Sequence, residues 1–355
     1  MPDGQPEIAL VVATLNRKER LAALLTSLCA QTIACHRWEL WIAVDGSEDG
    51  TLPLLEHWQG RRLLPLQYFF QENAGQAQAR HAAILRSRAP RIAVVDDDME
   101  VCPGFLDQHL AAGQSDPEQA VVIGKVVPRP RWRRYPLYSA VVEQSTLELH
   151  NRLEHGLQAP SATAFVTQNV SFPRSLYFQA GGFDASLRLD EDRELGLRLE
   201  RAGGRFVFAP LASATHHSDV GSYHTWEERQ YEYGHYAVRV WEKHGRDPYV
   251  HPLRNYVTGS RLNHWTVNLY VPSERRTHCA CRLLRLAGTV LHGLRLDRPA
   301  IATHKGIRTL QYHLGVKHAV GSWARLRELA ESYANDSKSP ATPTGRGETM
   351  RTRST

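Results

Sequence analysis

A regular alternation of strand and helix patterns over the first 125 residues constrains the fold most strongly. Short apolar runs, which are typical of strands, alternate with segments whose apolar residues recur every three or four positions, as in helices. This alternation predicts the α/β fold class, with a doubly wound, mostly parallel sheet and right-handed crossovers. The predicted strands are 8–14, 38–44, 66–70, 92–95 and 120–126, and the predicted helices are 17–30, one running through 55–58, 76–85 and 105–112.

The composition is that of an ordinary globular protein, with 42% hydrophobic and 23% charged residues among 355. A net charge of +6 suits anionic partners, such as nucleotide phosphates, an acidic membrane face or nucleic acid, without selecting one of them. The five cysteines show neither zinc-ligand spacing nor an even-numbered framework, which favours a reducing compartment. Since no secretory signal and no long apolar run is evident, we expect a cytoplasmic protein.

The strand–helix rhythm ends near residue 128, where a basic, proline-punctuated segment begins. Farther on, the patterns predict strands at 163–172 and 205–209 and helices at 193–201 and 226–244, and residues 256–333 favour helices. The tail is rich in Ser, Thr, Pro and Gly and is predicted to be disordered. We therefore expect a domain of residues 1–250, in halves 1–125 and 126–250, then a helical C-terminal extension, 251–335, and a disordered tail, 336–355.

Three consecutive carboxylates, Asp96, Asp97 and Asp98, follow the apolar run 92–95. They therefore lie at the carboxyl end of a predicted strand, where open α/β sheets bind their ligands. Adjacent carboxylates repel one another unless a cation or hydrogen-bond donors offset their charge. Mg²⁺ and Mn²⁺ bind carboxylate oxygens and leave positions for phosphate oxygens. The motif indicates a metal–diphosphate site, and the alternative is a solvated acidic turn before the next helix.

Two motifs in the first half have both a functional and a structural interpretation. Asp45 ends the second predicted strand, where its carboxylate can accept a hydrogen bond from a nucleobase or simply form an Asp-Gly turn. Gly75 leads into a helix of small residues, so backbone N–H groups or Arg80 can approach an anion. A helix start that packs closely against the sheet explains the same pattern.

Two motifs in the second half are similarly ambiguous. The acidic segment 190–194 opens a helix, where one carboxylate can act as general base or simply complement the helix dipole. His216 and His217 follow the strand 205–209, and a neutral imidazole there can complete the coordination of Mg²⁺ or Mn²⁺. An adjacent pair is also expected by chance in a chain with 18 histidines.

Taken in order, these motifs resemble those of family 2 glycosyltransferases, the inverting enzymes with a GT-A fold. The resemblance covers roughly residues 7–245 and departs at Leu15, where an aromatic residue is common, and at His81, where Asn is usual. The matching landmarks are Val11–Arg17, Val44–Ser47 with Asp49 and Thr51, Asn73 and Gly75, Ala79–Arg80, Asp96–Asp98 in place of the D-x-D signature, Gln168–Phe172, Gly181–Asp184 and Glu191–Leu195.

The resemblance implies that residues 1–250 form a GT-A catalytic domain, with a nucleotide-binding half, 1–125, and an acceptor half, 126–250. It implies transfer of a sugar from a nucleoside-diphosphate sugar, most commonly a UDP-sugar, to the hydroxyl of a glycan, lipid-linked or small-molecule acceptor. It further implies a Mn²⁺ or Mg²⁺ cofactor, a place in polysaccharide or glycoconjugate biosynthesis, and no nucleic-acid partner. The donor sugar, the acceptor and the oligomeric state are left open by the sequence.

The resemblance also implies a role for each matching residue. Asp192 would deprotonate the acceptor hydroxyl, and Asp98 would bind the metal, with His216 or His217 as a further ligand. The nucleotide sugar would be bound by Thr14, Asn16, Arg17, Asp45, Arg80, Asp96 and Asp97. The acceptor would be bound by Asn169, Gly182, Phe183, Asp184 and Glu191.

Two other functions use similar sheets. A sugar nucleotidyltransferase needs a Gly-rich, basic loop directly after the first strand, which residues 13–17 do not provide. A catalytically inactive sugar-nucleotide-binding module would not need the carboxylates that match the base and the metal ligand. Separately, the segment 282–295 combines apolar residues with arginines. It either makes a peripheral contact with the inner face of the membrane or packs on the catalytic domain with its arginines in water.

Overall fold

The computed structural model describes residues 4–130, 136–218 and 221–336, and the chain separates into two compact units. Unit 1 comprises the chain up to Trp226 together with Ala287–Lys305, and unit 2 comprises Glu227–Leu286 together with the residues from Gly306 on. The domain boundary predicted at residue 250 falls inside unit 2. Apart from residue 336, the predicted disordered tail lies outside the described residues.

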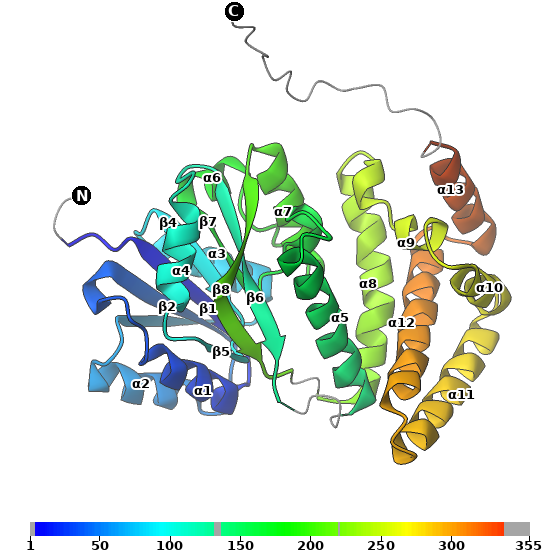
Figure 1. Ribbon diagram of the computed structural model, residues 1–355, viewed down its shortest axis with the longest axis horizontal. Coiled ribbons are helices and arrows are strands. Elements are labelled where there is room, and N and C mark those ends of the chain that lie inside the picture. Colours follow the sequence, from blue (N-terminus) through cyan, green and yellow to red (C-terminus); the bar gives the residue numbers. More distant parts are fainter. Residues whose placement is uncertain (1–3, 131–135, 219–220, 337–355) are drawn as a thin grey trace, which may run out of the picture. The chain divides into compact units, whose positions relative to one another are not determined.

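Unit 1 contains an eight-stranded sheet flanked by helices (Figure 1). The strands are β1 Ile8–Thr14, β2 Trp38–Asp45, β3 Leu66–Gln71, β4 Arg91–Val95, β5 Met99–Val101, β6 Ala120–Pro128, β7 Asn169–Pro173 and β8 Arg205–His216. The helices that lie wholly in this unit are α1 Lys18–Leu28, α2 Thr51–Arg61, α3 Gln76–Arg86, α4 Phe105–Gly113, α5 Leu137–Glu154, α6 Arg174–Gln179 and α7 Glu191–Arg201.

The strand order is β3-β2-β1-β4-β7-β6-β8-β5. The pairs β3–β2, β2–β1, β1–β4 and β6–β8 are parallel, so most of the sheet has the parallel pairing predicted from the sequence. Strand β7 is antiparallel to both β4 and β6, and β5 is antiparallel to β8. The start of β7 therefore lies at the same edge of the sheet as the carboxyl ends of β1 and β4.

Strand β1 is buried on both faces, as expected for a central strand of a parallel sheet. Ile8, Leu10 and Val12 belong to the core beneath α1, α2 and α4, whereas Ala9 and Val11 belong to the core beneath α3, α6 and α7. This alternation places the two helix layers on opposite faces of the sheet. The site described below lies at the carboxyl-terminal edge of the sheet.

The first four predicted strands agree with β1–β4 to within one residue, whereas later elements differ. The predicted strand 163–172 is a short 3-10 turn followed by β7. The strand predicted at 205–209 is longer in the structure, where β8 continues to His216. The prediction ended too early because Pro210 interrupts the apolar pattern, although it does not end the strand. Helix α5 was not predicted, since its buried residues include polar Ser139, Glu143 and His150. Strand β5 has only three residues, too few to show a period.

Unit 2 is helical, as the sequence pattern predicts. Its helices are α8 Tyr223–Lys243, α9 Arg254–Val257, α10 Arg261–Tyr270, α11 Glu274–Gly293, α12 Asp297–Ala319 and α13 Trp323–Asp336, of which α8, α11 and α12 cross the boundary between the units. Within unit 2, α8 and α12 approach closely at two glycines. A Cβ atom on Gly234 would lie 1.9 Å from the carbonyl oxygen of Tyr312, and one on Gly315 would lie 2.0 Å from that of Tyr231. Within the described ranges, every helix is too short or too polar to cross a membrane.

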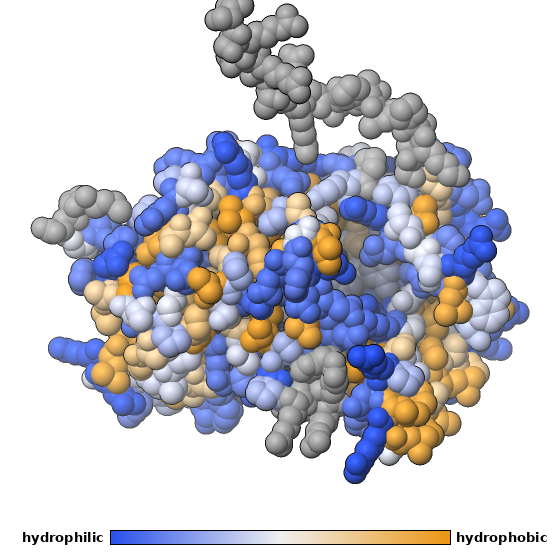
Figure 2. All heavy atoms as spheres, in the orientation of Figure 1, coloured by the Kyte–Doolittle hydropathy of each residue, from blue (hydrophilic) through white to orange (hydrophobic). Residues whose placement is uncertain are grey.

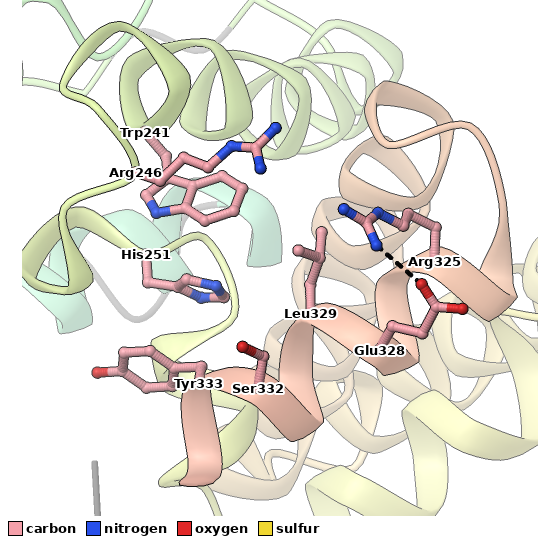
Figure 3. A pocket seen from close by; sticks show the side chains of 8 residues that line it. All are labelled: Trp241, Arg246, His251, Arg325, Glu328, Leu329, Ser332 and Tyr333. Atoms are coloured by element: carbon pink, nitrogen blue, oxygen red, sulfur yellow. Dashed lines mark hydrogen bonds and ion pairs between the residues drawn. The ribbon is translucent and has the colours of Figure 1, made fainter. Parts of the chain in front are cut away.

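A cavity of about 280 Å³ lies within unit 2 (Figure 3). Trp241, His251 and Tyr333 form one side, and Arg325 on the opposite side donates a hydrogen bond of 2.8 Å to Glu328. The cavity shares no residue with the carboxylate cluster of unit 1. The residues that line it are Trp241, Arg246, His251, Arg325, Glu328, Leu329, Ser332 and Tyr333.

Candidate active site

The carboxyl ends of β1, β2 and β4 bring most of the predicted site residues together. Thr14 ends β1, Asp45 ends β2, and Asp96–Asp98 follow β4. The start of β7 and the end of β8 lie near the same edge, because Asn169 pairs with Val95 and His216 pairs with Met99. The sheet therefore assembles residues from positions 14 to 216 into one cluster.

The three consecutive carboxylates are held by two arginines. Arg17 Nη1 donates to Asp97 Oδ1 at 3.1 Å and to Asp98 Oδ2 at 3.0 Å. Arg80, whose side chain is 1% exposed, pairs with Asp96 and donates to Thr167 Oγ1 at 2.7 Å. Burial raises the pKa of Asp97 to about 6, although the charge of Arg17 opposes this shift. Because Asp97 and Asp98 are buried, the alternative of a solvated acidic turn is wrong.

Asp98 lies beside His216, which in turn lies beside Glu143. His216 Nε2 is 3.7 Å from Asp98 Oδ2, and His216 Nδ1 is 3.2 Å from Glu143 Oε1. Burial alone would lower the pKa of His216, but hydrogen bonds and charge interactions with the two carboxylates raise it to about 10. His217 instead places its Nε2 2.9 Å from Glu100 Oε1. The His217 backbone N–H donates to the Asp98 carbonyl oxygen at 2.9 Å, so of the two imidazole rings it is that of His216 that lies beside the Asp98 carboxylate.

The donor set around Asp98 fits a divalent metal that is completed by substrate oxygens. Asp98 Oδ1 is buried and has no hydrogen-bond partner in the described part of the chain. Within that part, no three His, Cys, Asp or Glu side chains form a ready metal cage. A carboxylate and an imidazole are nevertheless suitable ligands for Mn²⁺, and Mg²⁺ commonly takes few protein ligands together with phosphate oxygens. Asp98 and His216 can therefore supply the protein half of such a site.

Asp45 organises the loop that follows β3. Its Oδ1 accepts hydrogen bonds from Gln71 Nε2 at 2.8 Å and from the backbone N–H of Ala74 at 2.9 Å, and its Oδ2 accepts from the N–H of Gly75 at 3.0 Å. Gly75 has a φ of +93°, a conformation that favours glycine. Asp45 thus fixes the entry into α3, which carries Arg80, and its contact with a nucleobase stays a prediction.

Asn16 fixes the turn between β1 and α1. Thr14, the last residue of β1, is buried. The Asn16 N–H donates to Ser47 Oγ at 2.9 Å, and Asn16 Oδ1 accepts from the N–H of Glu48 at 2.8 Å. Asn16 has a left-handed backbone with φ 52°. The turn after β1 is thereby tied to the turn after β2, and it directs Arg17 towards the carboxylates.

The acidic start of α7 joins the cluster through Arg80. Glu191 is buried, and its Oε1 lies 3.5 Å from Arg80 Nη1. Burial and the charge of Asp192 raise the pKa of Glu191 to about 7, against the attraction of Arg80. Asp190 has a left-handed backbone with φ 59°, and burial raises its pKa to about 6. Asp192 is half-buried, and its Oδ1 accepts a hydrogen bond from the N–H of Arg193.

The structure gives Asn169 a role different from the predicted one. Asn169 is 1% exposed, and its Nδ2 donates to the carbonyl oxygens of Lys125 and Ala212 at 3.1 and 2.9 Å. Its Oδ1 lies 2.8 Å from His109 Nε2. With these contacts the Asn169 amide cross-links the sheet, and the geometry does not support the acceptor contact predicted for it.

Gly182 and Phe183 also have structural contacts. Phe183 is buried, and its N–H donates to the hydroxyl of Tyr177 at 3.0 Å. A Cβ atom on Gly182 would lie 3.0 Å from the ring of His81, whose Nδ1 is 2.7 Å from the same hydroxyl. Of the predicted acceptor residues outside α7, Asp184 alone is half-exposed, and its Oδ1 accepts from the N–H of Ser186.

Sequence reasoning missed Glu143 and Thr167. Glu143 is fully buried on α5 and faces His216, and Thr167 accepts a hydrogen bond from Arg80. A signal for Glu143 existed, since this acidic residue directly follows the apolar residues 140–142. Nothing in the local sequence marks Thr167.

The sequence is similar to a known protein family and to proteins that have been characterised. Residues 9–178 match the family model described as glycosyl transferase family 2. Validoxylamine A glucosyltransferase of Streptomyces hygroscopicus subsp. jinggangensis is 30% identical over 222 residues, which is 56% of this chain and 52% of that protein. The chain thus spans about half the length of this relative.

Two solved structures share the fold. Mannosyltransferase PcManGT from Pyrobaculum calidifontis, in complex with GDP-Man and Mn²⁺, has a TM-score of 0.61 and 19% identity, with 89% of this chain and 88% of that chain covered. The S. aureus TarS 1–349 structure in complex with UDP-GlcNAc has a TM-score of 0.53 and 18% identity, with 89% of this chain and 93% of that chain covered. The mixed α/β fold is therefore that of the GT-A glycosyltransferases.

The raised pKa of Glu191 predicts a pH-dependent stability. The native state holds the Glu191 proton to about pH 7, whereas the unfolded chain releases it near the ordinary value of 4.5. The native state therefore binds more protons between these values, and this contribution to stability falls as the pH rises. Relative to wild type, Glu191→Gln should gain about 2 kcal/mol in free energy of unfolding between pH 5 and pH 8.

Urea unfolding of both proteins at the two pH values measures this gain. Glu56→Gln, an exposed carboxylate change on α2, is the matched control and should show no such gain. An equal stability difference between Glu191→Gln and wild type at both pH values would contradict the raised pKa.

Proposed function

Because residues 9–178 belong to glycosyl transferase family 2, we propose that this protein transfers a sugar from a nucleoside-diphosphate sugar to an acceptor hydroxyl with inversion at the anomeric carbon. The observation that carries the proposal is the cluster of Asp96, Asp97 and Asp98 at the carboxyl end of β4, of which Asp97 and Asp98 are buried, with His216 beside Asp98. A site for a cation and a diphosphate group needs clustered carboxylates, whereas a turn with a purely structural role does not.

We propose a UDP-sugar as the donor. UDP-sugars are the donors most often implied by the family resemblance, and the TarS structure contains UDP-GlcNAc, whereas the PcManGT structure contains GDP-Man. The proposed donor residues are Thr14, Asn16, Arg17, Asp45, Arg80, Asp96 and Asp97, which line the edge formed by β1, β2 and β4. The acceptor is a glycan, a lipid-linked sugar or a small molecule.

Asp98 and His216 are the proposed metal ligands. They would hold Mn²⁺ or Mg²⁺, which when bound would supply positive charge against the negative charge of the departing nucleoside diphosphate. The chain's own contribution is to keep Asp98 ionised, since His216 and Arg17 lower its pKa although burial opposes this. Glu143 orients the His216 ring from the opposite side.

Asp192 is the proposed general base. It lies half-buried in the first turn of α7, where its Oδ1 accepts a hydrogen bond from the N–H of Arg193. The acceptor oxygen would lose its proton to Asp192 while it attacks the anomeric carbon from the face opposite the diphosphate, so one displacement inverts that centre. Glu191, anchored to Arg80, holds the start of α7 at the edge of the donor site.

Replacement of the proposed base gives the first test. Asp192→Asn removes the proton acceptor but keeps the size of the side chain, so we expect sugar transfer to fall by roughly 10²-fold or more. Binding of the nucleoside diphosphate should stay within about twofold, because Asp192 touches the acceptor side. Initial rates and isothermal titration calorimetry measure the two effects, with Glu56→Gln as control. A variant that keeps a tenth of the wild-type rate would exclude Asp192 as the base.

The two adjacent histidines form a matched pair for the metal site. His216→Ala should raise the Mn²⁺ concentration that half-saturates donor binding by roughly tenfold or more, because it removes a ligand next to Asp98. His217→Ala should change it less than about twofold, because His217 faces Glu100. Titration of Mn²⁺ into EDTA-treated protein with UDP distinguishes them. Equal effects of the two variants would contradict this assignment.

The choice of nucleobase is tested by thermal shift. In the presence of Mn²⁺, UDP should raise the Tm more than GDP or dTDP at the same concentration, because a ligand stabilises the native state according to its affinity. The Asp45→Asn variant should reduce the difference between the nucleotides. A larger shift with GDP would replace the UDP-sugar by a GDP-sugar donor and leave the proposed reaction class unchanged.

A further inference from the structure

Helix α11 carries a row of large apolar side chains that face solvent. Leu283, Leu286 and Val290 are 63%, 64% and 55% exposed, and Leu294, directly after the last residue of the helix, is 65% exposed. The spacing of three and four residues places the three helical side chains on one face of the helix, and Leu294 continues the same spacing. Single exposed apolar residues are ordinary on soluble proteins, but a contiguous row marks an interaction surface. Figure 2 shows hydrophobic surface gathered over the outer part of α11.

The segment that contains α11 is strongly basic. Between Glu274 and Asp297 the chain contains five arginines and no acidic residue. Arg276 precedes Leu283 by seven residues and Arg282 precedes Leu286 by four, so both arginines lie on the face with the apolar row. This combination of apolar centre and positive charge is typical of helices that lie on an anionic lipid surface.

The opposite face of α11 is packed against neighbouring residues. Thr277, Ala280 and Cys281 are buried, and a Cβ atom on Gly288 would lie 2.4 Å from Thr303 Oγ1. The helix is therefore folded and packed through one face, while the apolar row on its other face is exposed. It can bind a partner without any rearrangement of the helix.

Helix α10 carries a second row of the same kind. Leu262, Trp265 and Leu269 are 71%, 60% and 37% exposed and are spaced by three and four residues. Tryptophan is enriched where proteins meet the boundary between lipid and water, because its ring is apolar and its N–H is polar. Two successive helices thus expose apolar rows, which strengthens the case for a lipid partner.

We infer that α11 docks this protein on an anionic membrane surface, with Leu283, Leu286, Val290 and Leu294 in the headgroup region and the arginines on the lipid phosphates. The helix lies on the membrane rather than across it, since the described helices are too short or too polar to span one. A second copy of the chain fits less well, because a symmetric contact through this face would bring the arginine rows together. The inference does not depend on the proposed enzymatic reaction.

Vesicle binding by the full chain tests the inference. The protein should co-sediment with phosphatidylcholine vesicles that contain phosphatidylglycerol, and roughly tenfold less with pure phosphatidylcholine or at high salt. No binding to the anionic vesicles, or equal binding to both compositions, would overturn the inference.

Two double variants separate the apolar and the electrostatic contributions. Leu286→Gln/Val290→Gln should weaken binding to the anionic vesicles by roughly tenfold or more. Arg276→Gln/Arg282→Gln should weaken it by roughly 30-fold, since each arginine contributes about a fivefold gain. All four positions are exposed, so unfolding temperatures should match that of wild type.

The matched controls are Leu157→Gln and Arg88→Gln, which change exposed residues that do not belong to α10 or α11 and should bind like wild type. Binding that is unaffected by both double variants would overturn the inference. A second outcome would also overturn it: wild type forms a dimer in solution, Leu286→Gln/Val290→Gln dissociates that dimer, and no protein binds the vesicles. The face would then be a contact between two copies.

Discussion

The compensation of buried negative charge is the constraint on which the site depends. Asp97 and Asp98 are 4% and 5% exposed, and adjacent carboxylates in such an environment are strongly unfavourable unless cations or donors accompany them. Arg17 provides this compensation for Asp97 and Asp98, and Arg80 on α3 pairs with the neighbouring Asp96. Arg17 reaches its two carboxylates because β1 and β4 are parallel neighbours, so that the turn after β1 and the turn after β4 lie at one edge.

Arg80 also connects the end of β4 to the start of α7. Its guanidinium lies between Asp96, which follows β4, and Glu191, which opens α7. A cation that is 1% exposed has few alternatives to these partners, so the position of α7 is coupled to that of the carboxylates. The proposed base, Asp192, follows Glu191 directly and is therefore held at a defined place beside the proposed donor site.

Much of this arrangement is visible in the sequence. Residues 8–95 show their strands and helices clearly, because a central parallel strand is a continuous apolar run and its flanking helices have a regular period. The position of Asp96–Asp98 at a strand end follows directly from that pattern. Helix α5 and strand β5 escaped notice, since one buries polar residues such as Glu143 and the other is only three residues long.

Local pattern was sufficient for the class of fold, for the order of the motifs and for the amphipathic character of residues 282–295, because each depends on residues a few positions apart. The folded chain was needed to show that the ring of His216, rather than that of His217, lies beside the Asp98 carboxylate, that Asn169 cross-links strands, and that burial raises the pKa of Glu191. These properties arise from desolvation and from charges that are distant in sequence, such as Glu143 and His216, and only folding brings such groups together.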